Sequence, residues 1–104
     1  VDGESSVAIR ARVEAARQRQ RQRLEAFGLH ANSQMQARHI RKFCAVDEAG
    51  HKLLEMVTDR LGLSARSYSR ILKVARTIAD LAGSPTTARP HIAEALSYRR
   101  LNLT

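Results

Sequence analysis

The sequence predicts an all-α protein, a small bundle of five helices. Apolar residues recur at steps of three or four along five segments, which is the period of an amphipathic helix. Residues typical of helix ends separate these segments, and no run alternates apolar and polar residues in the manner of a half-buried strand. The 104 residues are 43% hydrophobic but include only two Tyr, two Phe and no Trp, so aliphatic side chains must form most of the core. The length suits one domain.

The first two helices are expected in the N-terminal half. Ser5 or Ser6 can cap the first helix, and Gly28 can end it in the left-handed conformation. Asn32 is expected to cap a short second helix that ends near Val46. The expected apolar stripes are Ile9, Val13, Ala16, Gln20, Leu24 and Phe27 in the first helix, and Met35, Ile40, Phe43 and Cys44 in the second. The first stripe is thin, because a polar glutamine stands in its middle.

The C-terminal half carries the longer apolar stripes. Asp47 begins a third helix that Gly62 ends, and Ser64 caps a fourth helix that Gly83 ends. Pro90 fits the first turn of a fifth helix. The stripes are Leu53, Leu54, Val57 and Leu61, with Leu63 over the helix end; then Tyr68, Ile71, Leu72, Ala75, Ile78, Ala79 and Ala82; and last Ile92, Ala95, Leu96 and Tyr98. The fourth helix has the longest stripe and is expected to be the central, most buried element.

Positive charge is concentrated near the N-terminus. The chain has 18 basic and 10 acidic residues, a formal net charge of +8. Residues 10–23 contain one acid, Glu14, and six arginines, which gives this stretch a net charge of +5. The arginines are Arg10, Arg12, Arg17, Arg19, Arg21 and Arg23. Such a surplus favours an anionic partner, either nucleic acid or an acidic protein surface.

The motifs of self-contained enzymes are absent from the sequence. There is no P-loop, no HExxH and no GxSxG, and the four histidines lie in separate segments without metal-ligand spacing. We therefore expect neither enzymatic activity nor a bound cofactor or metal in this chain alone. The acidic residues are interpreted as capping and surface residues: Glu48, Glu55, Asp59, Asp80 and Glu94.

The lone Cys44 is interpreted as a small core residue rather than a nucleophile, since it lies beside Phe43 on an apolar face. A single cysteine allows no intramolecular disulfide, which favours a reducing compartment. No apolar run approaches the length of a membrane span, and no secretory signal pattern is present. The sequence therefore favours a cytoplasmic protein, and its start at Val1 suggests a fragment of a longer one.

Arg66 is the residue best placed for chemistry. It falls in the first turn of the fourth helix, where free N–H groups and the helix dipole favour an anion. Its planar guanidinium can form two charge-assisted hydrogen bonds with a phosphate group. The same position and spacing also fit a solvated surface arginine, so the residues alone leave both interpretations open.

Four segments, in order, resemble the C-terminal domain of the magnesium-chelatase-related AAA+ ATPases, the ComM/YifB competence family. They are Ile9 to Gln20, His39 to Cys44, Leu63 to Gly83, and His91 to Arg99. The resemblance spans nearly the whole chain. One departure is Thr87, where relatives usually carry a branched aliphatic residue.

The resemblance implies that residues 6–100 form the helical lid of such an ATPase, with 1–5 a linker from a missing ATPase core and 101–104 a frayed tail. It implies a parent that binds ATP and Mg²⁺ through that core and assembles with neighbouring subunits into a hexamer. It also implies action on DNA, by branch migration in natural transformation. Arg66 corresponds to the family's sensor-2 arginine, which makes it the catalytic and cofactor-binding candidate.

Two other interpretations remain open. The third and fourth helices resemble a helix-turn-helix whose second helix presents Arg66, Ser69, Arg70 and Lys73 to DNA. Alternatively, the arginine-rich first helix is an interaction module that docks on an acidic partner or on the parent's own core. The candidates for nucleic-acid binding or core docking are Arg10, Arg12, Arg17, Arg19, Arg21, Arg23, Arg70 and Lys73.

Overall fold

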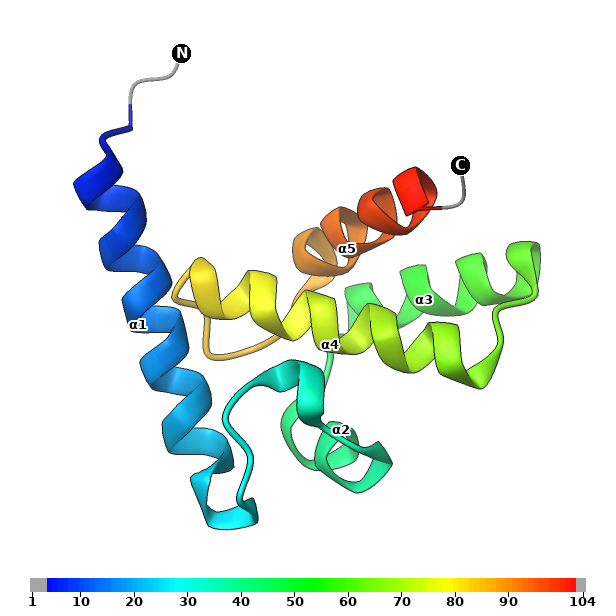
Figure 1. The fold of residues 1–104 in the computed structure, drawn as a ribbon. Coiled ribbons are helices and arrows are strands. Elements are labelled where there is room, and N and C mark those ends of the chain that lie inside the picture. The colour runs from blue at the N-terminus through cyan, green and yellow to red at the C-terminus, as the bar shows by residue number, and fades with distance from the viewer. Residues whose placement is uncertain (1–3, 103–104) are drawn as a thin grey trace.

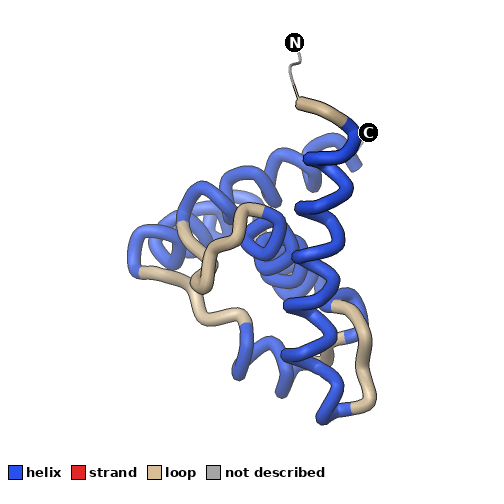
Figure 2. Tube along the Cα trace, turned by 90° about the vertical axis from the view of Figure 1, so that its left-hand side faces the viewer, coloured by secondary structure: helices blue, strands red, loops and turns tan. Residues whose placement is uncertain are grey.

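The structure is a computed structural model that describes the backbone of residues 4–102 and the side chains of residues 4–98. The helices are α1 (Ser6–Leu24), α2 (Ala37–Phe43), α3 (Glu48–Leu61), α4 (Ala65–Leu81) and α5 (Arg89–Asn102). Two short 3₁₀ turns, η1 (Glu25–Phe27) and η2 (Asn32–Gln34), connect α1 to α2. Figure 2 shows only helices and loops in this part of the chain. The predicted all-α, five-helix fold is confirmed.

Helix α4 lies at the centre of the bundle (Figure 1). Helix α5 packs against both α4 and α3, while α1 crosses the C-terminal half of α4, and η2 and α2 pack on another side of it. Helix α4 also has more buried residues than any other element: Ile71, Leu72, Ala75, Arg76, Ala79 and Asp80. This confirms that α4 is the central helix, although two of its six buried residues are charged.

The core consists mostly of aliphatic side chains from all five helices. Its buried members are Leu24, Met35, Ile40, Cys44, Leu53, Leu54, Ile71, Leu72, Ala75, Ile92 and Ala95. Cys44 is one of them, and burial raises the pKa of its thiol to about 11. The thiol is therefore protonated at neutral pH. Its place in the core confirms the interpretation of Cys44 as a small core residue. Five residues that were expected on apolar faces are instead exposed, most of them near helix ends: Ile9, Phe27, Leu61, Ala82 and Tyr98.

Most of the predicted helix ends are confirmed. The side chains of Ser5, Asp47 and Ser64 accept hydrogen bonds from backbone N–H groups in the first turns of α1, α3 and α4. Gly62 has a positive φ and ends α3 in the left-handed conformation, as predicted. Gly28 also has a positive φ, but it ends the 3₁₀ turn η1, because α1 itself already ends at Leu24. These signals are local, which is why the sequence alone located them.

The start of the second helix was predicted wrongly. Asn32 does not cap it, because its side chain is buried and hydrogen-bonds to Thr77 Oγ1 (3.0 Å) and Asp80 Oδ2 (2.9 Å) on α4. Helix α2 begins only at Ala37, where His39 Nδ1 accepts a hydrogen bond from the backbone N–H of Gln36 (2.9 Å). A polar residue expected to serve the local backbone thus contacts a distant helix instead.

The turn before α5 pairs with the loop before α3. The N–H of Asp47 donates to the carbonyl of Thr87 (3.1 Å), which joins the two segments in an isolated parallel bridge. Thr87 is fully buried, and its hydroxyl has no hydrogen-bond partner among the described residues. The polar atom therefore lies in a place that suits an aliphatic side chain.

The predicted linker and tail fall largely at the edges of the described chain. Residues 1–3 and 103–104 lie outside the described residues, while α5 is helical as far as Asn102. Among the described residues, no helix is long and apolar enough to cross a membrane.

Candidate functional site

Arg66 lies at the exposed N-terminal end of α4. Ser64 Oγ accepts a hydrogen bond from Ser67 N (3.1 Å), so the cap fixes where the helix starts and places Arg66 in its first turn. The free N–H groups of this turn and the helix dipole carry partial positive charge there. Arg66 therefore adds a full positive charge to a helix end that already favours anions.

A groove begins at Arg66 and follows α4. It has a volume of 380 Å³ and is lined by Ser33, Arg66, Ser69, Arg70, Lys73 and Val74. Three of these residues are basic and none is acidic. Among the described side chains, no carboxylate forms an ion pair with Arg66, Arg70 or Lys73. The fold thus gathers three predicted candidates into one groove whose charge is not neutralised.

Lys73 marks the inner end of this basic groove. Its Nζ lies 3.3 Å from the carbonyl oxygen of Ser33 and 3.5 Å from that of Met35, both in or next to η2. These contacts hold the ammonium group between α4 and η2. No local pattern predicted this arrangement, because the η2 residues are about forty positions away from Lys73 along the chain.

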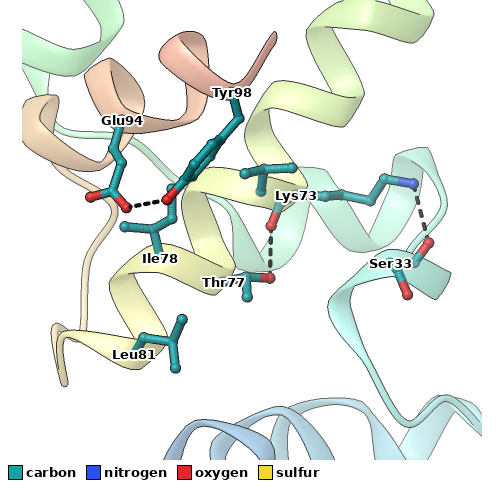
Figure 3. Close-up of a pocket in the computed structure, with 8 residues that line it drawn as sticks. Ser33, Lys73, Thr77, Ile78, Leu81, Glu94 and Tyr98 are labelled. Atoms are coloured by element: carbon teal, nitrogen blue, oxygen red, sulfur yellow. Dashed lines mark hydrogen bonds between the residues drawn. The ribbon is translucent and has the colours of Figure 1, made fainter. Parts of the chain in front are cut away.

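An apolar groove continues from the basic one toward the C-terminal end of α4 (Figure 3). It has a volume of 290 Å³ and is lined by Ser33, Lys73, Val74, Thr77, Ile78, Leu81, Glu94 and Tyr98. The hydroxyl of Tyr98 donates to Glu94 Oε2 (3.0 Å), and this bond to a carboxylate raises the pKa of Tyr98. The two grooves share Ser33, Lys73 and Val74, so they form one continuous depression along α4.

A second cluster of charges is buried between α1 and the C-terminal half of α4. The Asp80 carboxylate is fully buried, and Arg23 donates to both of its oxygens, at 2.9 and 2.7 Å. Arg76 Nη2 lies 3.1 Å from the same carboxylate, and Asn32 Nδ2 donates to it at 2.9 Å. Asp80 was interpreted from the sequence as a surface or capping residue, and that interpretation is wrong.

The titration of Asp80 reflects these partners. Burial alone raises the pKa of the carboxyl group, but the hydrogen bonds from Arg23 and Asn32 and the charges of Arg23 and Arg76 outweigh burial. The net result is a pKa below the usual range, so Asp80 is ionised at neutral pH. The hydrogen bond to Asp80 correspondingly raises the pKa of Arg23. The cluster therefore binds α1 to α4 as a charged unit.

The six arginines of α1 fall into different surroundings. Arg23 pairs with Asp80, and Arg19 Nη1 donates to the carbonyl oxygen of Asp80 (3.0 Å), so both attach α1 to α4. The other four are exposed, with mostly local contacts: Arg12 pairs with Glu4, Arg17 with Glu14 at 3.9 Å, and Arg21 donates to Gln18, while Arg10 has no ion pair in this part of the chain. Part of the basic surplus thus has an internal, structural role.

Sequence reasoning missed Arg76 as well as Asp80, although a signal was present. Leu72, Arg76 and Asp80 follow one another at steps of four, so all three lie on the buried face of α4. An Arg–Asp pair at that spacing within an apolar stripe indicates a buried ion pair. Arg76 also donates to the carbonyl oxygens of Ser84 (2.7 Å) and Pro85 (3.1 Å), which holds the loop after α4.

The histidines and carboxylates of the described chain form no group of three or more that could hold a metal ion. Two histidines instead accept hydrogen bonds from backbone N–H groups at the starts of helices. His39 accepts from the backbone before α2, and His91 Nδ1 accepts from the N–H of Ala88 (2.9 Å) before α5.

Comparison with known proteins identifies the family to which this chain belongs. The model of the family described as magnesium chelatase, subunit ChlI C-terminal, matches residues 3–99. YifB of Escherichia coli is 42% identical over 102 residues, which cover 98% of this chain and 19% of that protein. The competence protein ComM of Haemophilus influenzae is 40% identical over 99 residues, which cover 95% of this chain and 19% of ComM. No solved structure matches the chain.

The chain belongs to the magnesium chelatase subunit ChlI C-terminal family. Its resemblance to the corresponding part of the ComM and YifB proteins is thereby confirmed. The chain spans about a fifth of the length of these curated relatives, at 19% of each.

Proposed function

We propose that this domain is the lid of a magnesium-chelatase-type AAA+ ATPase and that Arg66 contacts the γ-phosphate of the bound nucleotide. The observation that carries the proposal is the position of Arg66, exposed in the first turn of α4 and at the mouth of a basic groove without carboxylates. Among the described residues, Arg66 has no ion-pair partner, so its guanidinium is available to a phosphate that another domain presents. Membership in a family of C-terminal domains supports the proposal that another domain of the parent protein presents this phosphate.

In the proposed parent protein, an ATPase core would hold ATP and Mg²⁺ and would assemble with neighbouring subunits into a hexamer. The 104-residue chain has no P-loop, so we expect it neither to hydrolyse ATP nor to bind it tightly by itself. We further propose that the parent acts on DNA, by branch migration in natural transformation, and that it is cytoplasmic. The similarity to a protein named as a competence protein supports a role in competence.

The decisive experiment measures steady-state ATPase activity of the full-length parent. Arg66→Ala should lower turnover by roughly one to three powers of ten, the scale on which arginines stabilise phosphoryl transfer. Arg66→Lys should recover only part of the rate, because an ammonium group cannot reproduce the bidentate guanidinium.

The matched control is Arg60→Ala, which removes an exposed arginine from the last turn of α3, outside the groove. It should retain full activity. Arg70 is unsuitable as a control, since it lines the same groove as Arg66. Full ATPase activity in the Arg66→Ala ring would exclude the sensor role.

A nucleic-acid-binding module is the second candidate function. The residues that a recognition helix would need, Arg66, Ser69, Arg70 and Lys73, do line one groove, and exposed arginines remain on α1. Both candidates allow weak binding of duplex DNA that falls steeply with salt. Sequence-selective binding that resists salt would favour the DNA-reading module over the lid.

A further inference from the structure

We infer that Arg66, Arg70 and Lys73 act together as a site for an oligophosphate, a chain of closely spaced phosphate groups, rather than for one phosphate at Arg66. The inference rests on the proposed function, since it takes a nucleotide's phosphates as the natural ligand. It goes further because it adds Arg70 and Lys73 as binding residues and predicts that the chain of phosphates lies along α4. Three features of the groove support it.

The first feature is the spacing of the three cations. They occupy positions i, i+4 and i+7 of α4, so their side chains leave the same face of the helix. With a rise of 1.5 Å per residue, their backbone positions span roughly 10 Å along the helix axis. A single phosphate at the helix end cannot occupy a row of this length, whereas a chain of phosphates can.

The second feature is the absence of internal neutralisation. The arginines at 66 and 70 repel each other at i,i+4 spacing, and no acidic side chain lines the groove. The buried cluster on the same helix shows the opposite arrangement, with the Asp80 carboxylate between two arginines. An anion along the groove would supply the counter-charge that no carboxylate among the described residues supplies there.

The third feature is that Lys73, at the far end of the row of three cations, is held in place. Lys73 is held against the carbonyl oxygens of Ser33 in η2 and Met35 next to it, and the hydroxyl-bearing residues Ser33 and Ser69 line the same groove. The ammonium group has three donors, so it can keep a backbone contact and still donate to a phosphate oxygen. The row therefore ends in a positioned charge rather than in a freely moving one.

The test uses the 104-residue chain and NMR titration with tripolyphosphate, with orthophosphate as the single-phosphate probe. Tripolyphosphate should bind roughly tenfold or more tightly than orthophosphate at low salt, with amide shifts along residues 66–74 and at Ser33. Arg66→Gln, Arg70→Gln and Lys73→Gln should each weaken tripolyphosphate binding by about threefold or more. Arg60→Gln removes the same charge outside the groove and should leave the affinity almost unchanged.

Two outcomes would overturn the inference. If Arg60→Gln weakens binding as much as the groove variants do, the chain attracts phosphates only through its net charge. If Arg66→Gln alone weakens binding, the site holds one phosphate and the proposed sensor role stands without Arg70 and Lys73. Conversely, loss of tripolyphosphate binding in all three variants, combined with normal ATPase activity of the Arg66→Ala parent, would support the groove and refute the proposed function.

A second set of titrations distinguishes a nucleotide from a nucleic-acid strand as the natural ligand. ATP should shift the same amides as tripolyphosphate, and a ten-nucleotide single strand at equal phosphate concentration should compete weakly. A single strand that displaces tripolyphosphate more effectively than ATP would overturn the assignment to nucleotide and would identify the ligand as a phosphodiester backbone.

Discussion

The two ends of α4 use arginine in opposite ways. Near the C-terminal end, Arg76 is buried together with Asp80, and Arg23 from α1 completes the cluster. Near the N-terminal end, Arg66 and Arg70 line an open groove without a carboxylate. The guanidinium group is the same in both places. The comparison shows that the distribution of carboxylates, rather than the number of arginines, separates structural charges from charges available to a ligand.

Burial explains why the first cluster needs its acid. A charge removed from water loses several kcal/mol of hydration, which only a partner with good geometry offsets. The cluster meets this condition with a bidentate Arg23–Asp80 pair and an additional amide donor from Asn32. The groove arginines keep their hydration, so their positions require no partner inside the protein.

The largest effect on stability is expected from Asp80→Ala. This change leaves the guanidinium groups of Arg23 and Arg76 buried without their counter-charge, and should destabilise the fold by about 3–5 kcal/mol. Urea denaturation measures the change. The double variant Arg23→Met, Asp80→Leu should lose less than Asp80→Ala, because only Arg76, and no longer Arg23 as well, then lacks the carboxylate. An Asp80→Ala variant within 1 kcal/mol of the wild type would mean that α1 does not depend on this cluster.

Acid should abolish the contribution of Asp80. Its folded-state pKa is depressed, so the stabilisation is complete above the unfolded pKa of about 3.9 and is lost as pH falls through the lower folded pKa. The free-energy difference between the wild type and Asp80→Asn should therefore be constant near neutral pH and shrink below about pH 4. Urea midpoints of both proteins between pH 2 and 7 provide the measurement. A difference that grows on acidification would contradict the assigned direction.

Thr87 tests whether a buried polar group without a partner destabilises the fold, as a buried charge without a partner does. Thr87→Val keeps the branched shape and removes a fully buried hydroxyl that has no hydrogen-bond partner among the described residues. The change should stabilise the domain by about 1 kcal/mol, the lower end of the cost of an unsatisfied buried polar group. Thr86→Val, at an exposed neighbour, is the control and should be nearly neutral. Destabilisation by Thr87→Val would show that the hydroxyl is satisfied.

The smallest effect on stability is expected in the groove. Arg66→Ala and Arg70→Ala each remove an exposed arginine that has no ion-pair partner in the described part of the chain, so the free energy of unfolding should change by no more than about 0.5 kcal/mol. The same denaturation experiments measure it. A loss of more than 2 kcal/mol in the free energy of unfolding would show that these side chains stabilise the fold, as Arg23 and Arg76 do.

Local signals explain how much of the fold the sequence predicted. Ser64, Asp47 and Gly62 act on backbone atoms within four residues, and the stripe of α4 depends only on helical periodicity. The same locality placed Arg66 correctly in the first turn of α4. Asn32 failed as a predicted cap because its side chain contacts α4, forty-five and forty-eight residues further along the chain. Such contacts leave no trace in neighbouring residues.

By itself, the sequence determined the five helices, their principal caps and the family. Only the tertiary structure decided which basic residues are free to bind a ligand. Asp80 lies 57 residues from Arg23, and folding brings their side chains to 2.7 Å. Folding also sets η2 beside Lys73 and so forms the wall of the basic groove. Hydrophobic periodicity reports which face of a helix is buried, but the environment of a charge depends on residues that the chain brings together only when it folds.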